Sequence, residues 1–237
     1  MITNDKIDFS KCDFDLGETI LIDKPFGWTS FHVVHKIRNA VRVRKAGHAG
    51  TLDPLATGLL IICTGKKTKE ISKYQDMEKT YTGTITLGKS TPSMDMETEV
   101  IEEKSIVGIT EENILIQKEK FIGEIFQTPP MYSAIKHRGK SLYKFARKGK
   151  IVEREPRKVI VTKFNINEIK LPDIFFEISC SKGTYIRAIA DDLGKNLGCG
   201  AVLSSLRRTK IGDFNVENAV QVEEFKKIIK SRDLLLK

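Results

Sequence analysis

The chain has 237 residues, of which 40% are hydrophobic and 30% charged, a composition typical of a folded protein with one sizeable domain. No apolar run approaches the ~20 residues that cross a bilayer. Residues 1–16 are polar and acidic and lack the apolar core of a signal peptide. The four cysteines have no paired spacing, which is typical of reduced thiols rather than of a disulfide or zinc framework. These features favour a cytoplasmic protein without a membrane segment.

The net charge of +9 is concentrated in one segment. Residues 136–158 hold ten Lys or Arg and two Glu, a local excess of +8, so the rest of the chain is nearly neutral. A solvated charged surface is the ordinary explanation of a basic segment. So large a share of the charge in so short a stretch favours an arm that binds a polyanion.

The first third of the chain alternates short apolar runs with helical patterns. The run Glu18–Asp23 predicts a buried strand, and Thr29 or Ser30 then begins a helix with apolar residues on one face. A second buried strand is expected at Leu59–Cys63, followed by a helix from Lys66 to Tyr74. The segment Tyr81–Leu87 alternates apolar residues with threonines, which predicts a half-buried strand.

The remaining elements also mix helices and strands. Thr110 opens a helix that ends near Gly123, and a short helical stripe begins at Leu142. The runs Val159–Leu171 and Ile174–Cys180 predict a strand pair. Later elements are a helix from Tyr185 to Gly198, a short strand at Ile211–Phe214 and a helix over Val220–Leu236. This pattern predicts the α+β class.

The loop Ala46–Gly58 carries the densest group of special residues. Its glycines permit positive φ, and Pro54 restricts Asp53 to an extended conformation, which suits a rigidly held carboxylate. An ordinary turn with a helix-capping Asp would explain an isolated Asp-Pro pair. Because His48 lies in the same loop and a buried run follows, the pattern favours a functional loop.

This loop and five further segments resemble the TruB-type pseudouridine synthases. The matching segments occur in the order of the family's motifs: Leu21–Ser30, Gly47–Pro54, Lys79–Tyr81, Gln127–Ala134, Ser181–Arg187 and Gly198–Arg208. The resemblance implies a single catalytic domain over residues 1–215, with a central mixed, mostly antiparallel sheet flanked by helices. It also implies a basic RNA-binding thumb at about 128–158.

The resemblance further implies an activity that needs no cofactor and no metal. Members of the family isomerise uridine 55 in the TΨC loop of tRNA to pseudouridine, after flipping the base out of its stack. By motif position, Asp53 is the nucleophile and acts at C1′ of the sugar or C6 of the base, a choice that the sequence leaves open. Arg187 would hold the charge and orientation of Asp53 through an ion pair, and Tyr81 would stack on the uracil. The alternatives without a catalytic role are a surface salt bridge for Arg187 and a position in the hydrophobic core for Tyr81.

Other positions are expected to bind the substrate. His48 matches the residue that fills the space left by the flipped base, and Tyr185 and Leu206 match walls of the pocket. Lys24 and Lys69 are expected to bind substrate, Lys69 through RNA phosphates. Arg207 and Arg208 are expected to line a basic cleft with the Asp53 loop and the thumb. The expected partner is the TΨC arm of tRNA, bound by a monomer that requires no protein partner.

Two segments depart from the family pattern. The acidic loop Thr91–Asp95 lacks the family's later glycine, and residues 216–237 predict one C-terminal helix in place of the PUA-type RNA-binding domain of many relatives. The sequence therefore leaves open a synthase for another RNA, such as ribosomal RNA, or a tRNA-binding or tRNA-folding protein. A hydrolase is disfavoured because Asp53 and His48 lack a serine or cysteine at a nucleophile turn.

Overall fold

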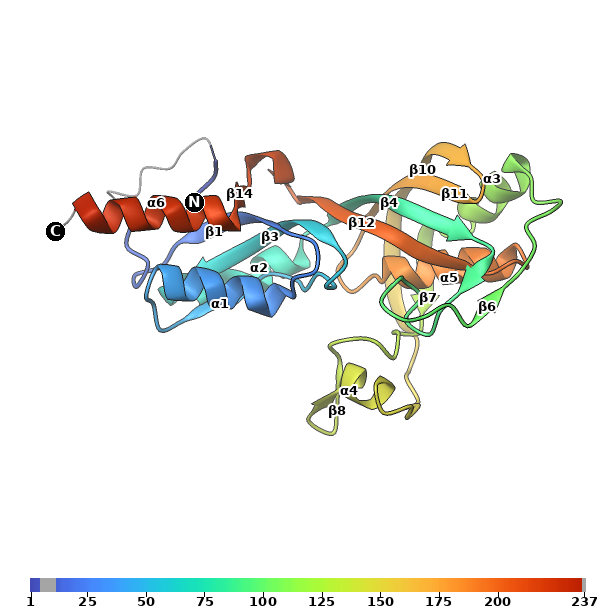
Figure 1. Ribbon diagram of the computed structural model, residues 1–237, viewed down its shortest axis with the longest axis horizontal. Helices are drawn as coiled ribbons and strands as arrows, with labels where there is room; N and C mark the ends of the chain where they lie inside the picture. The colour runs from blue at the N-terminus through green and yellow to red at the C-terminus, as the bar shows by residue number, and fades with distance from the viewer. Residues whose placement is uncertain (5–11, 236–237) are drawn as a thin grey trace. The chain divides into compact units, whose positions relative to one another are not determined.

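A computed structural model describes the backbone of residues 1–4 and 12–235 and, through residue 231, their side chains (Figure 1). The chain forms two compact units. The first, here called the terminal unit, comprises Met1–Tyr81 and Leu206–Lys237, and the second, the central unit, comprises Thr82–Ser205. Strands β4 (Lys79–Leu87) and β12 (Ala201–Ile211) pair with each other and contribute residues to both units.

The terminal unit is built on two buried strands. All six residues of β1 (Thr19–Lys24) are buried, and β1 pairs antiparallel with β3 (Thr57–Thr64), with Thr19 opposite Cys63. The other pairings make the sheet mixed: β14 (Val220–Gln221) runs parallel to β1, β12 runs parallel to β3, and β2 (Ala46–His48) runs antiparallel to β3. The strands predicted at Glu18–Asp23 and Leu59–Cys63 are confirmed. The short strand expected at Ile211–Phe214 is wrong, because Ile211 ends β12, a turn follows, and Phe214 begins the next strand. At its end, β12 turns back into β13 (Phe214–Asn215), which pairs antiparallel with it. The 3₁₀ helix η3 (Val216–Asn218) follows β13.

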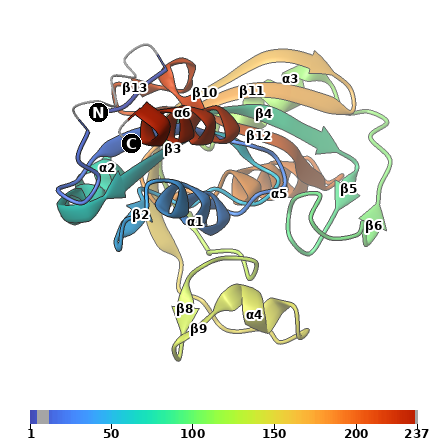
Figure 2. The same cartoon turned by 60° about the vertical axis from the view of Figure 1, so that its left-hand side comes forward.

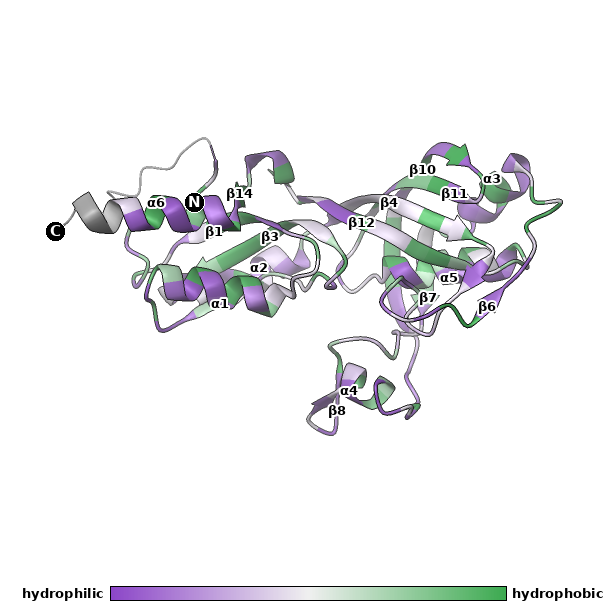
Figure 3. Ribbon diagram, viewed as in Figure 1, coloured by the Kyte–Doolittle hydropathy of each residue, from purple (hydrophilic) through white to green (hydrophobic). Residues whose placement is uncertain are grey.

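Two helices cover this sheet with apolar faces. Helix α1 (Ser30–Ala40) begins where the Thr29 hydroxyl accepts a hydrogen bond from the His32 N–H at 3.0 Å, as the capping pattern predicts. It packs with α6 (Val222–Leu235) and β1 around one core, to which the two helices contribute Val33, Val34, Ile37, Val222, Phe225 and Ile229 (Figures 1 and 3). Residue Val220 lies in β14 rather than in the expected helix because it pairs with Ile22.

The helix expected after β3 is divided in two. A 3₁₀ helix, η2 (Gly65–Glu70), precedes α2 (Ile71–Asp76). Gly65 has φ +50°, and its carbonyl oxygen accepts a hydrogen bond from the Thr68 hydroxyl at 2.8 Å, which favours the tighter turn. The lysines of η2 are thereby presented on a short, exposed turn.

The central unit continues the sheet in the order β4-β11-β10-β7. The predicted strand pair is confirmed as β10 (Arg157–Lys170) and β11 (Asp173–Cys180), antiparallel with two bulges, and β7 (Gly123–Gln127) pairs with the start of β10. Helices α3 (Glu111–Glu119) and α5 (Ile186–Asn196) belong to this unit, and Thr110 caps α3 as predicted. A short pair, β5 (Lys89–Ser90) and β6 (Glu102–Glu103), brackets the acidic loop.

The segment expected to form the thumb lies between β7 and β10. It contains the hairpin β8 (Lys136–His137) and β9 (Lys140–Ser141), followed by α4 (Leu142–Ala146), and it projects away from the sheet of its own unit (Figure 2). Its small core includes an edge-to-face contact of the Tyr132 and Tyr143 rings at 5.8 Å. Nine of the ten Lys and Arg side chains of residues 136–158 are exposed.

Candidate active site

The loop that carries Asp53 is fixed on both sides of that residue, to the start of α1 on one side and to the turn before α1 on the other. The Ser30 hydroxyl donates to the Leu52 carbonyl at 3.1 Å and accepts from the Leu52 N–H at 2.8 Å. On the other side, the Gly27 N–H donates to the Pro54 carbonyl at 2.9 Å. Gly50 and Gly58 adopt φ of +89° and +102°, which lets the chain leave β2 and enter β3 around this loop. Asp53 is therefore a half-buried carboxylate on a rigid turn.

Lys24 is a buried cation that binds this loop. It is 0% exposed, and its ammonium donates to the carbonyl oxygens of Trp28, Pro25 and Pro54 at 2.5, 3.0 and 3.1 Å. Burial lowers the pKa of Lys24 to about 8; the Asp53 carboxylate opposes this shift and Arg208 adds to it. With three backbone partners and no exposed surface, Lys24 ties the Asp53 loop to the turn before α1. The expected direct contact with substrate does not fit this burial.

Arg208 is a second buried cation beside the same loop. It is 1% exposed, and its guanidinium donates to the Leu59 carbonyl at 2.7 Å and the Gly50 carbonyl at 3.1 Å. A Cβ added to Gly58 would lie 2.3 Å from the Arg208 carbonyl oxygen, so the glycine is required for this close approach. The expectation that Arg208 lines an open basic cleft is wrong, because its charge is enclosed and already bound.

Arg207, the neighbouring residue, is only partly enclosed. It makes a two-point contact with the Asp23 carboxylate, at 3.1 and 2.7 Å, and Gln221 donates to the same carboxylate at 2.9 Å. The Arg207 side chain keeps 41% of its surface exposed. The sequence did not indicate that Arg207 and Arg208 have structural partners, because those partners lie about 150 residues or more away along the chain.

His48 lies on β2, half-buried and paired in register with Ile62. Burial, aided by Arg208, lowers the pKa of His48 below its ordinary value, against the effect of a backbone hydrogen bond with Gly50. The imidazole is therefore neutral at pH 7. Its Nδ1 is buried without a hydrogen-bond partner, so a polar group of His48 is left unsatisfied beside the Asp53 loop.

Two expected pocket residues also belong to the terminal unit. Tyr81 is 9% exposed and shares the buried face of β4 with Ile85, and Leu206 is half-buried on β12. Tyr81 lies on the same face as core residues, so both its stacking role and its core role agree with this position. Its contact with a uracil stays a prediction.

The central unit encloses Arg187 in the first turn of α5. Arg187 is 3% exposed, its Nε lies 3.5 Å from the Asp95 carboxylate, and its terminal nitrogens donate to the carbonyls of Ser93 at 2.9 Å and Tyr132 at 2.8 Å. The acidic loop thus supplies a carboxylate partner, Asp95, whereas the partner expected from the sequence was Asp53. Because Asp53 belongs to the other unit, an approach of Arg187 to Asp53 stays a prediction.

Tyr185 lies just before Arg187 and is fixed by a buried amide. Its N–H donates to the Gln127 side-chain oxygen at 3.0 Å, and the Gln127 amide nitrogen donates back to the Tyr185 carbonyl at 3.2 Å. This joins the end of β7, where the thumb begins, to the start of α5. The backbone that presents Tyr185 and Arg187 is therefore coupled to the base of the thumb.

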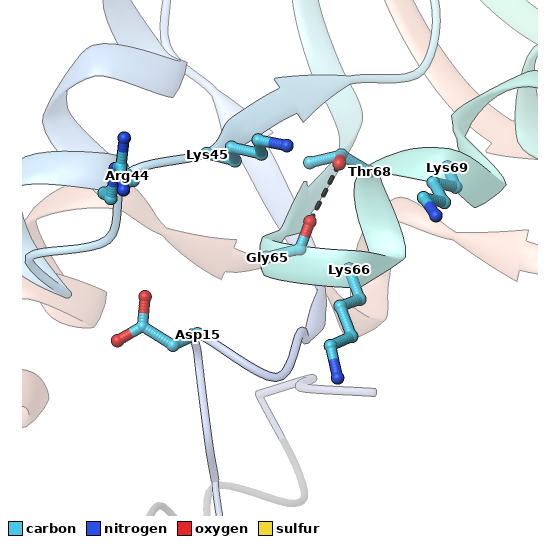
Figure 4. Close-up of a pocket in the computed structure, with 7 residues that line it drawn as sticks. All are labelled: Asp15, Arg44, Lys45, Gly65, Lys66, Thr68 and Lys69. Carbon is cyan, nitrogen blue, oxygen red and sulfur yellow. Dashed lines mark hydrogen bonds between the residues drawn. The ribbon is translucent and has the colours of Figure 1, made fainter.

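A cationic pocket lies beside η2 in the terminal unit (Figure 4). It is lined by Asp15, Arg44, Lys45, Gly65, Lys66, Thr68 and Lys69, which come from separate stretches of the unit. The four cationic side chains are exposed, and none forms an ion pair with a residue that the structure describes. Four cations against one carboxylate favour an anion such as phosphate. Lys69 was expected to bind phosphate, while Arg44 and Lys45 were missed.

Among the side chains that the structure describes, no group of three or more His, Cys, Asp or Glu is arranged to hold a metal ion. In the same residues, no helix combines the length and the apolar character needed to cross a bilayer.

Known sequences match this chain over nearly its whole length. The family described as TruB family pseudouridylate synthase (N terminal domain) matches residues 38–186, and the tRNA pseudouridylate synthase B C-terminal domain matches residues 187–235. The chain is 50% identical over 223 residues to the tRNA pseudouridine synthase B of Chloroherpeton thalassium, covering 92% of each chain. It is also 50% identical over 216 residues to that of Flavobacterium johnsoniae, covering 88% of this chain and 94% of the relative. The chain belongs to the TruB family of pseudouridylate synthases.

Solved structures confirm the fold. A chain of a Cbf5–Nop10–Gar1 complex superposes with a TM-score of 0.71 at 28% identity, covering 96% of this chain and 58% of that chain. A chain of an archaeal box H/ACA sRNP Nop10–Cbf5 complex gives 0.68 at 26% identity, covering 93% and 56%. This chain thus spans just over half the length of those two. The predicted α+β fold, a mixed sheet with flanking helices, is that of pseudouridine synthases.

Proposed function

We propose that this chain is a tRNA pseudouridine(55) synthase, which isomerises uridine 55 in the TΨC loop of tRNA. The observation that carries the proposal is the Asp53 loop: a half-buried carboxylate, clamped by Ser30, Gly27 and Lys24, in a chain of the TruB family. Binding of RNA alone does not require a carboxylate held in this way. A nucleophile does, because its oxygen must be held close to the reacting carbon.

The reaction rearranges bonds without oxidation or reduction. The C–N bond between uracil and C1′ breaks, the base turns, and a C–C bond forms from C5 of the base to the same sugar carbon. The proton of C5 is lost and N1 gains one, so atoms and charge balance without a cofactor. Asp53 serves as the nucleophile, at C1′ or at C6 of the uracil.

The positive charge of Lys24 favours the ionised form of Asp53. Lys24 is buried and fixed by backbone carbonyls, so its field acts with little screening by solvent. Arg187, held with Asp95, is proposed to complete the site together with Tyr81 and Tyr185. His48, neutral and incompletely hydrogen-bonded, is proposed to occupy the space left by the flipped base.

Exposed cations supply the affinity for RNA in this proposal. The cationic pocket and the thumb present Lys and Arg side chains that can replace the counterions of phosphates. The TΨC arm is the proposed partner, the protein acts as a monomer without a protein partner, and the reaction takes place in the cytoplasm.

The direct test is to incubate the protein with an unmodified tRNA transcript and to map pseudouridine by chemical sequencing. We expect modification at uridine 55 alone. The same assay with ribosomal RNA tests the alternative substrate. Absence of pseudouridine from tRNA, with modification of ribosomal RNA, would replace the proposed substrate; absence from both would contradict the activity.

A further inference from the structure

An exposed aromatic turn at the start of α1 has no role in the site described so far. Phe26 is 66% exposed and Phe31 is 74% exposed, while the rings of Trp28 and His32 stack with centroids 4.3 Å apart and planes 9° apart. Single exposed phenylalanines are common on protein surfaces. Residues 26–32, here called the aromatic turn, thus carry three exposed rings, those of Phe26, Phe31 and His32, and the half-buried ring of Trp28.

The aromatic turn is held rigidly against the Asp53 loop. Gly27 and Ser30, which lie within it, donate to the carbonyls of Pro54 and Leu52, and the Lys24 ammonium binds the Trp28 carbonyl as well as that of Pro54. These contacts stand on both sides of Asp53 in the sequence. A ligand on the aromatic turn would therefore sit at a fixed position relative to Asp53.

The charge of the neighbouring sequence indicates what kind of ligand fits. The sequence from Lys24 through Leu52 holds six Lys or Arg and no Asp or Glu, and of these only the Lys24 ammonium is fully buried. Exposed aromatic rings in a stretch that carries only positive charge match a ligand with planar apolar faces on an anionic backbone. Unpaired bases of RNA have this chemistry, and they bind proteins by stacking on aromatic side chains.

We propose that the aromatic turn stacks on an unpaired base of the RNA substrate, a neighbour of the target uridine in the loop. The proposal rests on the proposed function, because flipping the target uridine opens the loop and exposes the faces of its unpaired neighbours. With His48 in the space that the uridine leaves, the aromatic turn offers one of these neighbours a separate stacking partner beside the Asp53 loop. The aromatic turn would thus recognise the opened form of the RNA loop, whichever base stacks on it.

The test compares binding of a TΨC stem-loop by four variants at one salt concentration. Phe26→Ala and Phe31→Ala remove exposed rings without opening the core, and Phe31→Tyr retains a ring. Phe126→Ala is the matched control, since Phe126 is 71% exposed but lies on β7 of the central unit. We expect Phe31→Ala to weaken binding about tenfold, Phe31→Tyr to restore it, and Phe126→Ala to leave it unchanged.

Abasic RNAs then identify the contact. Each unpaired nucleotide of the loop is replaced in turn by an abasic residue. At one position the wild-type protein should lose about the same affinity, and Phe31→Ala should lose nothing further. The proposal would be overturned if Phe26→Ala and Phe31→Ala both bind the stem-loop within about twofold of wild type. It would also be overturned if every abasic RNA loses the same affinity for the wild-type protein. Either result would point to a protein partner or a structural role for the aromatic turn.

Pseudouridine formation by the wild-type protein is measured in the same samples. If it occurs while Phe31→Ala binds normally, the stacking proposal fails and the proposed function stands. If no pseudouridine forms in any RNA, the proposed function fails, and the base-stacking proposal fails with it.

Discussion

The positive charges of this protein fall into two groups that differ in burial. Lys24, Arg187 and Arg208 are 0%, 3% and 1% exposed, and backbone carbonyls, joined by a carboxylate in the case of Arg187, hold each of them. The cations of the thumb and of the cationic pocket are almost all exposed. Buried charges are costly unless they are fully bound, so they fix geometry, whereas exposed charges remain available for phosphates and are screened by salt. We therefore expect the first group to fix the geometry of the candidate site and the second group to bind RNA.

The largest expected effect concerns the carboxylate beside the buried group. Asp53→Asn keeps the shape of the loop but removes the nucleophile, so turnover should fall by more than ~1,000-fold, about 4 kcal/mol in transition-state stabilisation. Single-turnover assays of pseudouridine formation measure this change. Turnover within about tenfold of the wild-type rate would show that Asp53 is not the nucleophile.

Removing a buried cation should lower stability more than removing its exposed neighbour. Arg208→Ala leaves the Leu59 and Gly50 carbonyls without their donor and opens a cavity, so we expect a loss of roughly 3 kcal/mol in the free energy of unfolding. Arg207→Ala removes a partly exposed ion pair and should cost about 1 kcal/mol. Urea unfolding of the two variants gives the comparison, and equal losses would contradict the distinction between buried and exposed charges.

The lowered pKa of Lys24 should make the free energy of unfolding depend on pH above neutrality. The folded protein releases the Lys24 proton near pH 8, whereas the unfolded chain keeps it until about pH 10.5. Between these values the unfolded state binds more protons, so this group makes stability rise with pH, by roughly 2 kcal/mol over the window. Lys24→Met should lack that rise. The check is to measure the free energy of unfolding of the wild type and of Lys24→Met at pH 7.5 and at pH 9.5. The wild-type value minus the variant value should be larger at pH 9.5.

The smallest expected effect comes from the exposed group. Replacing Lys144, Arg147, Lys148 and Lys150 by Gln should weaken RNA binding about tenfold and reduce the slope of log affinity against log salt by roughly 0.7 to 0.9 for each phosphate that the variant no longer neutralises. The matched control replaces Lys89, Lys104, Lys163 and Lys170, each already within 4.0 Å of a carboxylate. An unchanged slope in the thumb variant would show that the thumb is only a solvated surface.

Local pattern predicted the elements whose apolar residues repeat regularly. The strands around Leu21 and Leu60 and the helix after Thr29 follow from buried runs and a capping residue. The end of the chain was harder, because Val220 is drawn into a strand by Ile22, about 200 residues earlier. Long-range pairing of this kind overrides a helical pattern.

The candidate site was predicted unevenly for a similar reason. The Asp53 loop carries its own signal in glycines and a proline, so its position and rigidity could be predicted. The burial of Lys24 and Arg208 could not, because it depends on the carbonyls of Pro54 and Leu59 converging in the folded state. In a sequence, a cation that will bind carbonyls cannot be distinguished from one that will bind phosphate.

One measurement tests the division between the two groups of charge most directly. The dissociation constant and the single-turnover rate at saturating RNA are measured on the same TΨC stem-loop, for Asp53→Asn and for the four-residue thumb variant. We predict that Asp53→Asn binds like the wild type but does not react, and that the thumb variant binds weakly but reacts at the wild-type rate once saturated. Loss of binding by Asp53→Asn, or a slow saturated reaction of the thumb variant, would contradict this account.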